Sequence, residues 1–162
     1  MIARGELKPG VELLQSSLPR LHAMRYELYA SAFVAQLSQG LAALGRLPEA
    51  LKVLNETIAR VDPEGAAFDM PELLRLRGEL EAGGGDLKAA EASLATSVAL
   101  AEQQGALSWR LRTEMSLVRL RRQQDLPGSL ASLAETYARF AEGFETADLK
   151  AARLMLDETP AP

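Results

Sequence analysis

Few residues in this chain of 162 could do chemistry. His22 is its only histidine, and no cysteine is present. A Ser-His-Asp arrangement could form only around His22, yet the sequence has no GxSxG nucleophile motif. The lack of cysteine also excludes disulfides, thiolate metal sites and cysteine nucleophiles. We therefore interpret His22 as a polar residue at a helix start after Pro19, and we expect no catalytic residue.

Two other features resemble chemical sites. Glu79, Glu81 and Asp86 have no histidine or thiolate companion at the spacing of metal ligands, so we expect them to form a solvated face. Residues 83–85 are three glycines, but a phosphate-binding loop follows a strand and precedes a lysine at the next helix start. Because this triplet follows a predicted helix, we expect a plain turn, and we predict no metal and no cofactor.

The composition favours one helical domain over residues 1–162. The apolar content is 48%, enough for a sizeable core. The 18 basic and 22 acidic residues are interspersed and give a net charge of −4. Because phosphate binding is driven by clustered lysine and arginine, nucleic acid is not expected as a direct partner. The first ten residues lack the apolar core of a secretion signal, and no apolar run approaches about 18 residues, so we expect a cytoplasmic protein without membrane contact.

The sequence repeats itself at intervals of about 40 residues. Similar segments begin at Gly5, Gly45 and Gly85, and a fourth copy around Leu126 fits with a slightly shorter shift. The aligned positions include Leu7, Leu47 and Leu87, then Gly10, Ala50 and Ala90, then Leu14, Leu54 and Leu94. Apolar residues within each copy fall three and four apart, which is the spacing of one helix face. Each repeat is therefore predicted to be a helix, a tight turn at a glycine and an antiparallel helix.

This pattern predicts an all-α fold, a tetratricopeptide-like α-solenoid of antiparallel helix pairs wound into a right-handed superhelix. HEAT and armadillo repeats, with a period of about 40–47 residues, also match the spacing. The small residues Ser38 and Gly78, each seven before a turn glycine, favour the tetratricopeptide pattern. The predicted units are a half repeat at 5–21, repeats at 23–61, 69–104 and 107–141, and a capping helix at 146–156.

The two ends of the array depart from a regular repeat. The first copy begins at its turn, so its helix, at about 9–19, has no first helix to pack against. We expect an apolar stripe there to be partly uncovered, made of Leu7, Val11, Leu14 and Leu18. An upstream repeat, a second copy of the chain in a homodimer, or the helix that starts near His22 could cover it. In the fourth repeat, Gln124 replaces the turn glycine and Pro127-Gly128 interrupts the helix start, which predicts looser packing.

Three segments carry a family resemblance: Phe68-Asp-Met-Pro-Glu-Leu-Leu-Arg-Leu-Arg-Gly-Glu-Leu80, Gly105-Ala-Leu-Ser-Trp-Arg-Leu-Arg112 and Glu142-Gly-Phe-Glu-Thr-Ala-Asp-Leu149. They resemble the C-terminal tetratricopeptide region of large bacterial predicted signal-transduction ATPases, which often carry a nucleotide cyclase or winged-helix DNA-binding domain at the other end. The resemblance extends over about 3–156 and implies a regulatory or sensory role, with upstream domains of the same polypeptide as partners. It implies no catalysis in this segment, since the nucleotide-binding and cyclase motifs belong to the other domains.

The remaining expectation is binding on the solenoid surface. In tetratricopeptide arrays the first helix of each pair lines a concave groove that receives a peptide or protein. The groove residues predicted from position are Gln39, Glu72, Arg75, Glu79, Glu114 and Arg121. Trp109 and Tyr137 are interpreted as core. A protein-interaction module is the leading hypothesis, a sensor of a small effector bound in the same groove is the second, and an unrecognised enzyme is the third.

Overall fold

A computed structural model describes residues 7–23, 30–61, 67–124 and 130–158. Over these ranges the chain forms eight α-helices and no strand, so the predicted all-α class is confirmed. The helices are α1 (Leu7–Ala23), α2 (Ala30–Ala43), α3 (Leu47–Val61), α4 (Met70–Gly83), α5 (Leu87–Gln103), α6 (Leu107–Gln123), α7 (Leu130–Ala138) and α8 (Ala147–Asp157). None of the described helices is both long and apolar enough to cross a membrane.

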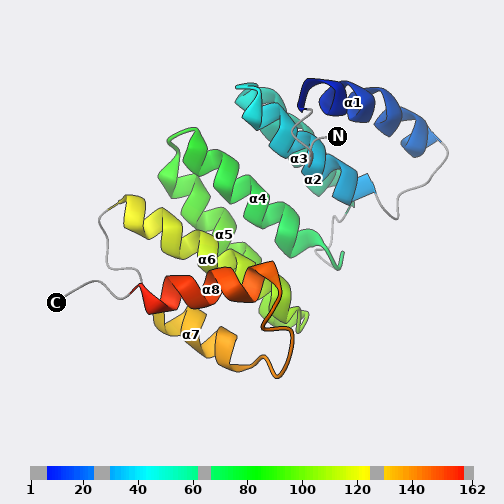
Figure 1. The fold of residues 1–162 in the computed structure, drawn as a ribbon. Coiled ribbons are helices and arrows are strands. Elements are labelled where there is room, and N and C mark those ends of the chain that lie inside the picture. The colour runs from blue at the N-terminus through cyan, green and yellow to red at the C-terminus, as the bar shows by residue number, and fades with distance from the viewer. Residues whose placement is uncertain (1–6, 24–29, 62–66, 125–129, 159–162) are drawn as a thin grey trace.

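Each helix packs against the next along the chain, and successive even-numbered helices also contact one another. Contacts join α2 to α4, α4 to α6 and α6 to α8. In Figure 1, α4, α5 and α6 lie in the middle of the molecule, with α1 to α3 at one end and α7 and α8 at the other. The even-numbered helices α2, α4, α6 and α8 therefore form a row, and we call the side of the molecule that they share the even-helix face.

Glycine turns end the helices at the predicted places. Gly45 and Gly85 adopt φ values of 77° and 85°, a left-handed conformation that side chains disfavour. At the first turn, the Gly45 N–H donates to the Ala42 carbonyl at 2.9 Å and the Arg46 N–H donates to the Leu41 carbonyl at 2.9 Å. This is the Schellman arrangement, which satisfies the last carbonyls of a helix and reverses the chain.

Small residues allow the paired helices to approach closely at positions that the repeats share. Ala50 and Ala90 are completely buried, and Ser38 is too. A Cβ placed on Gly78 of α4 would lie 2.7 Å from Cγ of Leu94 on α5 and 3.1 Å from the Ala90 carbonyl oxygen. The first distance is shorter than contacts between real carbon atoms and the second is tight, so a larger residue fits here only if α5 shifts.

Helix α1 differs from its prediction in length and in covering. It runs past Pro19 to Ala23. Proline has no N–H, so the Gln15 carbonyl loses its helical hydrogen bond. Gln15 and Pro19 are both exposed, so this carbonyl can bond to water instead.

The expected uncovered stripe is wrong for Val11 and Leu18, which are 1% and 6% exposed in the core that α1 shares with α2. Helix α2 covers them, but it begins at Ala30 and not near His22. The predicted helix start at His22 is wrong, because α1 continues through Pro19 and His22 is its second-to-last residue.

The C-terminal helix forms where it was expected. The Thr146 hydroxyl accepts from the Leu149 N–H at 3.5 Å and caps α8, and Leu149 is buried in a core shared with α6 and α7. Leu154 of the same helix is 64% exposed and does not belong to this core. The predicted interruption at Pro127-Gly128 lies outside the described residues, as do the side chain of His22 and residues 159–162.

Candidate functional site

The even-helix face carries an ion-pair series along α4. The Arg75 guanidinium lies 2.7 Å from a carboxylate oxygen of Glu72 and 2.6 Å from one of Glu79. The three residues are three and four positions apart, so they share one face of the helix. Burial disfavours the charge on Arg75, whose side chain is 11% exposed, but the two carboxylates outweigh it and raise the pKa of Arg75. The guanidinium is therefore held charged and in place.

Contacts from α6 and α8 extend this series across three helices. The Ser116 hydroxyl donates to Glu79 at 2.7 Å, and Nε of Arg112 donates to Asp148 at 2.6 Å. Arg112 also lies 3.8 Å from Glu72. We call this set the even-helix polar network, and it consists of Glu72, Arg75, Glu79, Arg112, Ser116 and Asp148. Its charges are paired within the chain, which suits a fixed surface better than acid–base chemistry.

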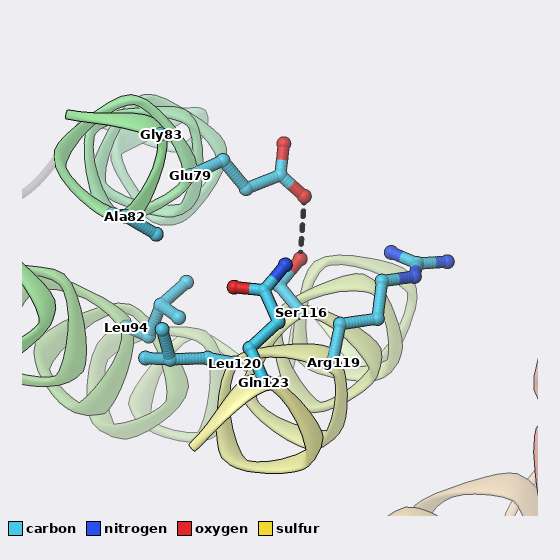
Figure 2. Close-up of a pocket in the computed structure, with 9 residues that line it drawn as sticks. Glu79, Ala82, Gly83, Leu94, Ser116, Arg119, Leu120 and Gln123 are labelled. Carbon is cyan, nitrogen blue, oxygen red and sulfur yellow. Dashed lines mark hydrogen bonds between the residues drawn. The ribbon is translucent and has the colours of Figure 1, made fainter. Parts of the chain in front are cut away.

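A cavity of about 240 Å³ is lined by residues of α4, α5 and α6. Figure 2 shows Glu79 and Ser116 pointing toward one another across it, while the guanidinium of Arg119 extends away. Leu94 and Leu120 form its apolar side. The cavity thus offers one polar bridge that is already satisfied and no free charged group directed inward.

A second cavity, of about 260 Å³, lies where α2, α4 and α6 meet, and we call it the α2–α4–α6 cleft. Its lining includes Ser31, Ala35, Gln36, Phe68, Asp69, Glu72, Trp109 and Arg112. Phe68 is 67% exposed, and the Arg112 guanidinium carbon lies 5.1 Å from the centre of the Trp109 ring. The Ser31 hydroxyl donates to Asp69. Exposed aromatic surface beside paired charges is a composition that peptide-binding grooves use.

The structure brings together three of the six predicted groove residues, Glu72, Arg75 and Glu79. Gln39 is an exposed residue of α2. Arg121 is paired with Glu91 of α5 at 3.4 Å. Glu114 is 3% exposed and lies in the interface between α6 and α7, so its predicted accessibility on the groove is wrong.

The expected solvated face of acidic residues is also only partly correct. Glu81 has a side chain that is 17% exposed; it accepts the Ser93 hydroxyl at 2.6 Å and lies 3.7 Å from Arg77. Asp86 accepts the Ala89 N–H at 3.0 Å and caps α5. Glu81 therefore links α4 to α5, and Asp86 stabilises the first turn of α5. No group of three or more potential metal ligands occurs among the described residues.

Sequence reasoning missed the residues of the α2–α4–α6 cleft that most suit binding. Trp109 was assigned to the core, yet it is half-buried and stacked with Arg112. The three-residue spacing of Trp109 and Arg112 on one helix could have indicated the pair. Phe68 precedes α4 in a segment without periodicity, so no pattern could show its exposure.

Comparison of the chain with known protein families, with curated proteins and with solved structures finds no match.

Proposed function

We propose that this chain is a non-catalytic tetratricopeptide-type module that binds a protein or peptide segment on its even-helix face. The observation that carries the proposal is the α2–α4–α6 cleft, where Phe68 is exposed beside the Trp109–Arg112 pair. The row of contacts from α2 through α8 supports a solenoid of paired helices, the arrangement in which first helices line a binding groove.

The cleft suits one side chain of a longer partner. Its volume of about 260 Å³ is below the range of about 300–1,000 Å³ that is usual for sites enclosing a whole small molecule. An apolar side chain of a peptide can contact Phe68 and Trp109 while the peptide backbone crosses the row of helices. Backbone N–H groups of the partner would face the carboxylates of Asp69 and Glu72, and its carbonyls would face Arg112. The volume thus favours a peptide over the alternative of a small effector in the groove.

The regulatory role rests on the sequence resemblance alone. It makes the partner another domain of a larger bacterial signalling ATPase or transcriptional regulator, in which this module would hold or release its neighbour. The reading frame upstream of Met1 tests this part of the proposal: an ATPase domain in frame supports it, and a stop codon there contradicts it.

Peptide binding can be tested through the only tryptophan of the chain. Peptides selected from a random library on the purified protein are titrated while the emission of Trp109 is recorded. We expect a saturable change, because Trp109 lines the cleft. Phe68→Ser should weaken binding by about tenfold or more, the effect of losing an aromatic contact of about 1.4 kcal/mol or more.

The matched control is Leu13→Ser, which removes an exposed apolar side chain, 53% exposed, from α1, a helix outside the even-helix face. This variant should bind the selected peptides with unchanged affinity. The proposal fails if no peptide is selected, or if Phe68→Ser and Leu13→Ser bind equally well. Circular dichroism of both variants verifies that the helices are retained.

A further inference from the structure

A third cavity, of about 360 Å³, lies between α5, α6 and α7 and shares no lining residue with the α2–α4–α6 cleft. We call it the α5–α7 cavity. Much of its wall is apolar, with Ala95 and Val98 from α5, Leu117 from α6 and Leu133 from α7. Its volume falls within the range of about 300–1,000 Å³ that is typical of small-molecule sites.

One wall of the α5–α7 cavity contains a buried carboxylate with an unused oxygen. Glu114 is 3% exposed, and its Oε1 accepts from Arg110 at 2.9 Å and from the Ser132 hydroxyl at 2.7 Å. Oε2 is buried and has no hydrogen-bond donor within the described part of the chain. Buried carboxylate oxygens are normally satisfied, because an unpaired one costs free energy.

The chemistry of these groups defines what would satisfy Oε2. An ionised carboxylate can only accept, so the ligand must donate, and a charged donor bonds to a carboxylate about twice as strongly as a neutral one. The Ser132 hydroxyl already donates its hydrogen to Glu114, and its oxygen can still accept a hydrogen bond from the donor group of the ligand. Arg121, the other charged residue of the wall, is paired with Glu91 at 3.4 Å.

We infer that the α5–α7 cavity is a binding site for a small primary amine with an apolar body. Its ammonium donates to Oε2 of Glu114 and to the Ser132 oxygen, and its carbon chain packs against Val98, Leu117 and Leu133. Because Oε2 is buried, binding requires the Glu114 side chain to turn toward the cavity, and a compact ammonium needs a smaller opening than a planar guanidinium. This site is separate from the even-helix face and does not depend on the peptide-binding proposal.

The test is a titration of the full chain with n-hexylamine, followed by two-dimensional NMR of the backbone amides. A ligand with few atoms binds weakly, so the titration extends to about 20 mM. We expect saturable shifts at residues of α5, α6 and α7 that surround the cavity. Uncharged n-hexanol, which has the same carbon chain, should bind at least about tenfold more weakly. The inference is overturned if n-hexylamine gives no saturable shift or if n-hexanol binds equally well.

Three variants locate the site. Ala95→Phe fills the cavity without changing Glu114 and should abolish the shifts, while Ala99→Phe, one turn further along α5 and outside the lining, should leave them unchanged. Glu114→Gln should lower the affinity for n-hexylamine by about tenfold and leave the affinity for n-hexanol unchanged. Should Glu114→Gln fail to fold, the Ala95→Phe and Ala99→Phe pair decides: equal binding by those two variants refutes the assignment.

Discussion

The crossing of α4 and α5 can be tested by adding one methyl group. Gly78→Ala places a Cβ 2.7 Å from Cγ of Leu94, a side chain that is 1% exposed and has little room to move. The same Cβ lies 3.1 Å from the Ala90 carbonyl oxygen, which belongs to the backbone. The methyl group can therefore be accommodated only if the two helices separate.

The expected cost follows from two opposing effects. Overpacking a well-packed core costs about 1–3 kcal/mol, while replacing glycine by alanine inside a helix gains about 0.5–1 kcal/mol. The central values of the two effects leave a net loss of about 1 kcal/mol in the free energy of unfolding. For a domain of this size, that loss lowers the melting temperature by about 2–4 °C.

The matched control is Gly83→Ala on the same helix, where an added Cβ meets no atom within 4 Å. This variant should be as stable as the native chain or slightly more so. Both are measured by urea unfolding followed by circular dichroism at 222 nm, with the slope against urea expected to stay constant. If Gly78→Ala matches the stability of Gly83→Ala, the close approach of α4 and α5 is wrong.

Two further predictions concern a charge and a turn. Hydrogen bonds from Arg110 and then from Arg139 lower the pKa of Glu102 below its ordinary value of 4.5, so its stabilising effect is complete above that pH and is lost as the pH falls through the lowered pKa. Glu102→Gln should therefore unfold at lower urea than the native chain at pH 7, and the difference should shrink as the pH falls below 4.5 and through the lowered pKa; a difference independent of pH contradicts this. Gly45→Ala should cost about 1 kcal/mol through its φ of 77° alone, since its Cβ meets nothing within 4 Å. Gly45→Asn should lower the urea concentration at the unfolding midpoint by less than Gly45→Ala does. Equal midpoints for Gly45→Ala and the native chain would refute the backbone strain at this position.

The helices were predictable because local signals agree with one another along most of the chain. The first helices of the predicted repeats at 69–104 and 107–141 are observed as α4 (Met70–Gly83) and α6 (Leu107–Gln123). The spacing of apolar residues identifies the middle of each of these helices, and a glycine turn marks the end of α4. At α1 the prediction was wrong, because Pro19 indicated the end of the helix. The helix continues because Pro19 lies on its exposed face, where a proline can be accommodated.

The candidate site was less predictable because most of its contacts join distant parts of the chain. The Glu72–Arg75 pair follows from a spacing of three residues on one helix. The Ser116–Glu79 bond joins residues 37 apart in sequence, and no pattern within one repeat indicates it. The same holds for Glu114, whose exposure depends on how α7 packs over α6. Position in a repeat predicts which helix face a residue occupies, but the neighbouring helix decides whether that face is open.

The pairing of charges on the even-helix face determines how it would recognise a partner. The Glu72 and Arg75 side chains are 16% and 11% exposed and already bonded to each other, so a partner that pairs with either must first replace an existing bond. The exposed surface of Phe68 has no such competitor, and burying it is favourable at any salt concentration. We therefore expect peptide affinity to change by less than about twofold between low and high salt, because only exposed charges are strongly screened. A steep loss of affinity with salt would instead assign recognition to the more exposed charges of the network, such as Arg112 at 36% and Glu79 at 39%, and would refute the aromatic anchor.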